Sequence, residues 1–184
     1  MRKGLAAGAL FASFVLAGCS SSGGATDPGT TAPAEPPAPE STSARTAPAK
    51  SLDVPDACSV VTAEQANALG ADQAPRPNDL HGTAGCNYQA GEAGTNGGWS
   101  AFVAADKSQT LQDFSAGMTD VQNVEVAGYP AGQIGTNPTN CILVLDVSDE
   151  GSLLIETLSR TGTPNPCDIS KQVAEAAVQN LPSA

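Results

Sequence analysis

The chain has 184 residues, with 19 acidic side chains against 8 basic ones and a formal net charge of −11 at pH 7. An excess of negative charge repels phosphate backbones and anionic polymers, so nucleic acid, anionic lipid and anionic wall polymers are excluded as main partners. The charge permits a cationic partner, although solubility alone also explains it.

The N-terminus has the pattern of an export signal. Arg2 and Lys3 precede an apolar stretch, residues 4–15, which is too short for a permanent membrane-spanning helix. Residues 16–19 read LAGC. This motif resembles the lipobox of bacterial lipoproteins, in which the cysteine takes a diacylglycerol and becomes the new N-terminus. An ordinary secretory signal with an incidental cysteine is the alternative interpretation.

The lipobox pattern predicts where the protein is located. We expect a signal peptide over residues 1–18 and a lipid anchor on Cys19, whose acyl chains, palmitate among them, contact the membrane. The protein is then expected on the extracytoplasmic face of the cell membrane. Removal of the signal takes away Arg2 and Lys3 but no acid, so the net charge falls from −11 to −13.

Residues 19–54 have the composition of a tether. They consist largely of Ser, Gly, Thr, Ala and Pro, and they contain almost no large apolar side chain. Such a segment cannot bury enough apolar surface to offset its ordering entropy, so we expect it to be disordered. Its upper reach, when fully extended, is on the order of 100 Å. Serines and threonines beside prolines also fit an O-glycosylated stalk, with a plain solvated linker as the simpler interpretation.

Four further cysteines, Cys58, Cys86, Cys141 and Cys167, lie after the tether. An even number of cysteines in an exported domain predicts disulfides, and four cysteines allow three connectivities. We favour Cys58–Cys86 and Cys141–Cys167, because each pair closes a moderate loop between neighbouring elements. The spacing matches no zinc motif and the chain has one histidine, so we expect no metal site and no cofactor.

Residues 55–184 are expected to form one domain, and its first half alternates helix and strand signals. A capping box at residues 62–65 begins a short helix that Gly70 ends. The spacing of apolar residues then predicts, in order, strands at 86–88 and 99–105, a helix through Leu111, Phe114 and Met118, and strands at 124–126 and up to 134.

The second half of this domain contains the most apolar segment. Residues 141–147 read CILVLDV, which predicts a central strand covered on both faces. Polar residues 148–151 form a hairpin that leads to an antiparallel strand at 153–158. The last helix begins at the cap residue Asn165 and ends before Pro182.

The order of these elements predicts the fold class. One helix, two strands, a helix, four strands and a final helix indicate an α+β domain. We expect an antiparallel sheet of about five to six strands with helices packed on it, and two disulfides.

Several short segments together resemble a family of actinobacterial lipoproteins classed as domain of unknown function 3558. The segments are residues 56–62, 85–88 and 126–131, Cys141 in its strand, and Pro166 with Cys167 at the start of the last helix. The resemblance extends from Pro55 to Leu181, with small departures at Ala57 and Tyr88. The family has no established activity, so the resemblance implies a location and a fold but no chemistry.

His81 is the candidate general base, in the polar segment 76–85. It would need an orienting acid such as Asp79 and a nucleophilic serine, and the sequence contains no G-x-S-x-G motif. A solvent-exposed loop histidine is the simpler interpretation, and we expect no catalytic residues. An acidic hairpin end, which matches no calcium loop, consists of Asp146, Asp149 and Glu150.

Three functions follow from these observations. The first is a non-catalytic binding module for a small ligand or an envelope partner. The second is a structural lipoprotein that docks on another envelope protein, and the distant third is an enzyme that uses His81. A pocket would favour the first function, whereas a solid core with an exposed apolar patch would favour the second.

Overall fold

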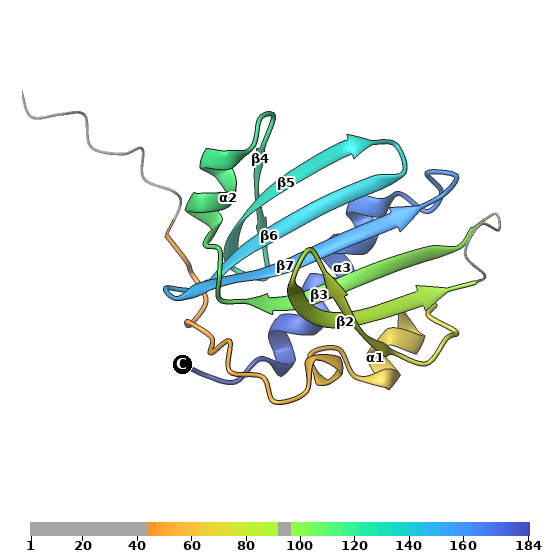
Figure 1. The fold of residues 1–184 in the computed structure, drawn as a ribbon, viewed down its shortest axis with the longest axis horizontal. Coiled ribbons are helices and arrows are strands. Elements are labelled where there is room, and N and C mark those ends of the chain that lie inside the picture. Colours follow the sequence, from red (N-terminus) through yellow and green to blue (C-terminus); the bar gives the residue numbers. More distant parts are fainter. Residues whose placement is uncertain (1–43, 92–96) are drawn as a thin grey trace, which may run out of the picture. The chain divides into compact units, whose positions relative to one another are not determined.

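A computed structural model of the chain describes residues 44–91 and 97–184. The expected signal peptide, the anchor residue Cys19 and the tether up to residue 43 lie outside the described residues. The described elements are η1 (Ala57–Ser59), α1 (Ala63–Ala68), β1 (Arg76–Leu80), β2 (Thr83–Ala90), β3 (Trp99–Asp106), α2 (Leu111–Gly117), β4 (Gln122–Val126), β5 (Tyr129–Asn137), β6 (Asn140–Ser148), β7 (Gly151–Ser159) and α3 (Pro166–Asn180). Figure 1 shows their arrangement.

One antiparallel sheet organises the domain. Its seven strands lie in the order β1-β2-β3-β7-β6-β5-β4, with β7 in the middle. The α+β class is therefore confirmed, whereas the expected number of five to six strands is too low. The additional strand is β1, which was expected to be part of a polar loop. Four of its five residues are exposed, so this edge strand lacks the apolar alternation that identifies a strand, and an edge also tolerates Pro77.

The two faces of the sheet are covered differently. The long helix α3 packs behind the sheet in Figure 1, against β6 and β7, and we name this side the α3 face. Its fully buried side chains include Leu143, Leu145 and Ile155, which meet Val173 of α3 in the main core. The opposite side, which we name the α2 face, receives the short helix α2 over β5 and β6.

The expected helix ends and the central strand agree with the structure. Thr62 and Gln65 form both bonds of the capping box of α1, and the Asn165 side chain caps α3 by accepting from the backbone N–H of Cys167. In β6, Leu143 is buried on the α3 face and Val144 on the α2 face, as expected for a strand covered on both sides. Met118 differs from the expectation, because α2 ends at Gly117 and leaves this side chain 48% exposed.

Two disulfides connect the sheet to segments outside it. Cys58 of η1 is bonded to Cys86 of β2, and Cys141 of β6 is bonded to Cys167 of α3, which are the two pairs that the sequence favours. The bonded residues are 28 and 26 positions apart. In the chain-entropy model a loop of this length stabilises the folded state by roughly 3–4 kcal/mol.

The folded part begins earlier than expected. Residues 45–54, which we name the strap, were assigned to the tether by composition, but they pack on the domain. The Tyr129 hydroxyl donates to the Pro48 carbonyl at 2.6 Å, the Lys50 N–H donates to the Val147 carbonyl at 2.8 Å, and Leu52 is 5% exposed. Backbone hydrogen bonds, the buried Leu52 and the ion pairs of Arg45 and Asp53 hold the strap, and composition does not reveal such contacts.

The close approach of β2 and β3 gives a test of the packing. A Cβ added at Gly85 would lie 2.4 Å from the Val103 carbonyl oxygen and 2.5 Å from the Phe102 ring. We expect Gly85→Ala to lower the free energy of unfolding by about 1–3 kcal/mol through overpacking. Gly117→Ala is the control, because a Cβ there meets nothing within 4 Å. Denaturant titration measures both variants, and equal stabilities would contradict the packing described here.

Candidate functional site

The α2 face is divided into a covered half and an open half. Over the covered half, Leu111 and Phe114 of α2 bury Val144 of β6, with partly buried apolar neighbours around them. The open half consists of Asn87 and Gln89 of β2, Ser100 of β3, and Glu156 and Leu158 of β7, which α2 does not reach. Farther along β3 on the same face, Phe102 and Ala104 are buried. The side chains of the open half are mostly polar, so the composition of this face changes where the helix cover ends.

Strand register brings residues of four strands together on the open half. Asn87 of β2 is paired with Phe102 of β3, which is paired with Glu156 of β7. Two positions further along the strands is a second row of paired residues. It consists of Gln89 of β2, Ser100 of β3, Leu158 of β7 and Asn140 of β6. Directly paired residues share a face of the sheet, so the polar side chains of these rows surround Leu158, while Phe102 between them is buried.

A hollow lies at the end of the open half that includes the end of β7. Its volume is about 320 Å³, within the range of small-ligand sites. Leu158, 47% exposed, contributes apolar surface to it. The residues that line it are Asn87, Gln89, Ala90, Gly98, Trp99, Ser100, Thr139, Leu158, Ser159 and Arg160.

A second, smaller hollow adjoins the first. It has a volume of about 180 Å³ and shares Asn87 and Gln89 with the larger hollow. Its remaining lining residues belong to β1 and to the segment before it, and they are Gln73, Ala74, Arg76, Pro77 and Asn78. The edge strand that the sequence did not reveal therefore forms one wall of the site.

Hydrogen bonds hold several of these side chains in place. The Gln89 side-chain amide donates to the Gly91 carbonyl at 2.9 Å. On the far side of Leu158, the Asn140 amide donates to the Glu156 carboxylate at 3.3 Å. The amide and carboxylate groups on either side of Leu158 are thus positioned by the sheet itself.

His81 and Asp79 do not form a catalytic pair. His81 and Gly82 are the central residues of the turn between β1 and β2, with φ values of 55° and 85°. Both values are positive, as in a two-residue hairpin turn of type I′. The Asp79 carboxylate accepts from the Gly82 N–H at 2.9 Å, so it caps the turn, and neither residue lines the two hollows.

The acidic hairpin end holds the strap. The Arg45 guanidinium forms ion pairs with Asp146, at 3.6 Å, and with Asp149. Burial raises the pKa of Asp146, the Arg45 charge lowers it, and the neighbouring Asp149 raises it again. Within residues 44–91 and 97–184, no group of three or more His, Cys, Asp or Glu side chains is placed to hold a metal ion.

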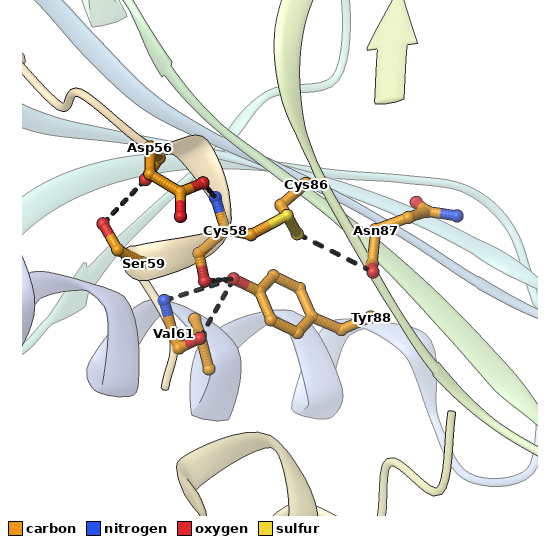
Figure 2. Close-up of a disulfide and its surroundings, with 7 residues drawn as sticks. All are labelled: Asp56, Cys58, Ser59, Val61, Cys86, Asn87 and Tyr88. Carbon is orange, nitrogen blue, oxygen red and sulfur yellow. Dashed lines mark hydrogen bonds between the residues drawn. A yellow bond between two sulfur atoms is a disulfide. The ribbon is translucent and has the colours of Figure 1, made fainter. Parts of the chain in front are cut away.

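A buried tyrosine lies beside the first disulfide, as Figure 2 shows. The Tyr88 hydroxyl oxygen accepts from the Val61 N–H at 3.3 Å. The hydroxyl donates to the carbonyl oxygens of Cys58, at 3.2 Å, and of Val61, at 3.1 Å. Burial raises the pKa of Tyr88 to about 12, against the lowering effect of the Val61 hydrogen bond. These bonds and the Cys58–Cys86 disulfide attach the segment before α1 to the sheet.

The residues of the two hollows were not singled out by the sequence. One signal was available, because Leu158 follows Glu156 at a position that alternation places on the same face of its strand. An apolar residue on a polar face indicates a contact surface, but it does not tell which strands lie beside it. Cys19, the expected anchor, lies outside the described residues, where the structure brings no further evidence.

Comparisons with known proteins give a family and no activity. The model of a family described as "Protein of unknown function (DUF3558)" matches residues 14–180. Searches of the curated proteins and of the solved structures found no match. Within the described residues, no helix is long and apolar enough to cross a membrane.

The Tyr88 hydroxyl gives a prediction with a defined pH dependence. Tyr88→Phe leaves the buried Val61 N–H without its partner, so we expect the free energy of unfolding to fall by about 1–3 kcal/mol at neutral pH. In the wild type the pKa of about 12 lies above the ordinary value of 10.0, so ionisation favours the unfolded chain and stability falls as the pH rises from 10 to 12.

Denaturant titration between pH 8 and pH 12 measures both effects. We expect the fall in stability above pH 10 to be smaller in Tyr88→Phe than in the wild type. The remaining fall comes from other groups, among them Tyr129, whose pKa burial also raises. Identical pH profiles for the two proteins would contradict the role given to Tyr88.

Proposed function

Because the chain belongs to the family of proteins of unknown function DUF3558, which assigns no activity, we propose a function from the chain's own residues. The protein is a lipid-anchored lipoprotein of the actinobacterial type, and its domain is a non-catalytic binding module on the extracytoplasmic side of the membrane. The domain holds a small ligand on the open half of the α2 face.

The open half carries this proposal. A sheet whose two faces were equally covered would offer no site, but here one face is sealed by α3 and half of the other is left uncovered by α2. The hollow of about 320 Å³ combines an exposed leucine with amide, hydroxyl and guanidinium groups. Concave apolar surface with a few placed polar groups is the usual composition of a ligand site.

The chemistry of the lining favours binding over catalysis. Among the described residues that line the larger hollow there is no histidine, cysteine or carboxylate. A general base and an activated nucleophile both need such groups within hydrogen-bond reach of the substrate. His81 is part of a turn, and Asp79, the acid that would orient it, is engaged by the Gly82 N–H.

The position of the hollow suits a tethered receptor. The strap contacts the turn between β6 and β7 through Arg45 and Asp149, whereas the hollow lies at the other end of β7, beside Leu158 and Arg160. The nine residues of β7 separate the two by about 25–30 Å. Figure 1 shows the chain entering near the start of β7, whose arrow points away from that end. A domain anchored through the strap would present its hollow away from the point of attachment.

The signal pattern and the cysteines support the proposed location. Cys19 ends an LAGC motif after a basic start and a short apolar stretch. The two disulfides of the domain are typical of proteins that fold outside the reducing cytoplasm. A lipid anchor and an oxidising compartment are both explained by export.

Replacement of the anchor residue tests the location. In the Cys19→Ala protein no thiol is present to accept the diacylglycerol at the lipobox, so we expect an unprocessed or shed protein. Detergent phase partitioning of cell fractions measures this, with Cys58→Ala as a control that removes a different cysteine. A Cys19→Ala protein that is cleaved and still partitions into the detergent phase like the wild type would refute the anchor.

Complementation of a deletion strain with a measurable phenotype tests the binding function. We expect Leu158→Glu to fail to restore the phenotype, because it places a charge on the apolar surface of the hollow. Met118→Glu is the matched control, since Met118 is 48% exposed and Leu158 47%. His81→Ala should complement fully. Complementation by Leu158→Glu, or its loss in a folded and anchored His81→Ala protein, would contradict the proposed function.

A further inference from the structure

We propose that the open half of the α2 face selects a small organic anion. Its oxyanion group binds the Arg160 guanidinium, its apolar part lies on Leu158, and Arg76 adds positive charge from the adjoining hollow. This inference rests on the proposed function and adds to it the chemical class of the ligand.

The charge of the lining differs from the charge of the chain. The chain has 19 acidic and 8 basic side chains, yet the described residues that line the two hollows include two arginines and no carboxylate. The uncharged polar groups of this lining include four carboxamides and three hydroxyls: Gln73, Asn78, Asn87, Gln89, Ser100, Thr139 and Ser159. In an acidic protein such a local excess of positive charge attracts an anion that the rest of the surface repels.

Among the described residues, neither of the two arginines forms an ion pair. Within the described part of the chain, the ion pairs of arginine and lysine involve Arg45 and Lys107. Arg76 makes one long contact, 3.4 Å, with the Gln73 side chain, and Arg160 follows the end of β7 on the exposed surface. A guanidinium presents a planar pair of donors that matches the two oxygens of a carboxylate or phosphate group.

The sheet determines how these groups are placed. Arg76 is the direct partner of Asn87, so both side chains lie on the α2 face. The Asn87 amide lines both hollows. Arg160 is two residues after Leu158, beyond the last paired position of β7. A ligand in the larger hollow therefore has the apolar surface of Leu158 beside it and a guanidinium at the rim.

Glu156 limits the charge that the site accepts. It lies on the same face as Leu158, two residues earlier, and its carboxylate accepts from the Asn140 amide. A carboxylate two residues from Leu158 on the same face disfavours a ligand with several negative charges. The site therefore suits one oxyanion group on a partly apolar body and not a polyanion.

Two fluorescent probes of the same shape test this inference. 8-Anilinonaphthalene-1-sulfonate carries an oxyanion, and N-phenyl-1-naphthylamine has the same rings without it. The protein is the chain from residue 19 onward with Cys19→Ser, which retains every described residue and needs no detergent. We expect the sulfonate to bind more tightly than the neutral probe, because only the sulfonate pairs with Arg160.

Matched variants separate the charge from the apolar surface. Arg160→Gln should weaken the sulfonate about tenfold and leave the neutral probe unchanged. Arg76→Gln should weaken the sulfonate less. Lys171→Gln, the same loss of charge on α3 at the opposite face, should change neither affinity. Leu158→Ser should weaken both probes, and Met118→Ser neither. Thermal unfolding checks that each variant folds.

The outcomes distinguish this inference from the function on which it rests. If Leu158→Ser weakens both probes while Arg160→Gln weakens neither, the hollow binds ligands without anion selectivity and this inference is wrong. If neither Leu158→Ser nor Arg160→Gln changes either probe, or if neither probe binds, the open half is not the site and the proposed binding function is wrong as well. Displacement of the sulfonate by benzoate or by phenyl phosphate then tells which oxyanion the site prefers.

Discussion

The packing of α3 against β6 and β7 closes the main core and determines which face of the sheet is available for a ligand. Fully buried leucine and isoleucine side chains of the two strands meet Val173, and the Cys141–Cys167 disulfide attaches the start of the helix to β6. At the same interface the Ser170 hydroxyl donates to the Thr157 hydroxyl at 2.8 Å, so two polar groups that are fully buried satisfy each other. The α3 face is therefore sealed along the middle of the sheet.

The length of α2 then limits what the second face can cover. Its seven residues span about 10 Å, which is only about two strand spacings. The helix accordingly covers β5 and β6, and the positions of Asn87, Gln89, Ser100 and Leu158 remain open. The strap contacts the opposite end of β7, at Asp149. The site and the point where the chain enters the domain are thus kept apart by the length of one strand.

Local sequence patterns predicted the elements that depend on local interactions. The capping box at Thr62 and the cap at Asn165 were found because a helix end is stabilised by side chains within three residues of it. The edge strand β1 was missed because exposure on both sides removes the alternation of apolar residues. The strap was missed because the Pro48 carbonyl and the Lys50 N–H contact the domain through the backbone, and most residue types can make such contacts.

The sequence by itself determined the fold class, the N-terminal caps of α1 and α3 and the preferred pairing of four cysteines, because caps, periodicity and spacing are properties of neighbouring residues. Only the tertiary structure decided that Arg76, Asn87, Leu158 and Arg160 line adjoining hollows, although 84 positions separate the first from the last. Periodicity tells which residues of one strand share a face, but strand order and register bring different strands together. Which part of that face stays open depends on where the helices pack, and no single segment encodes that.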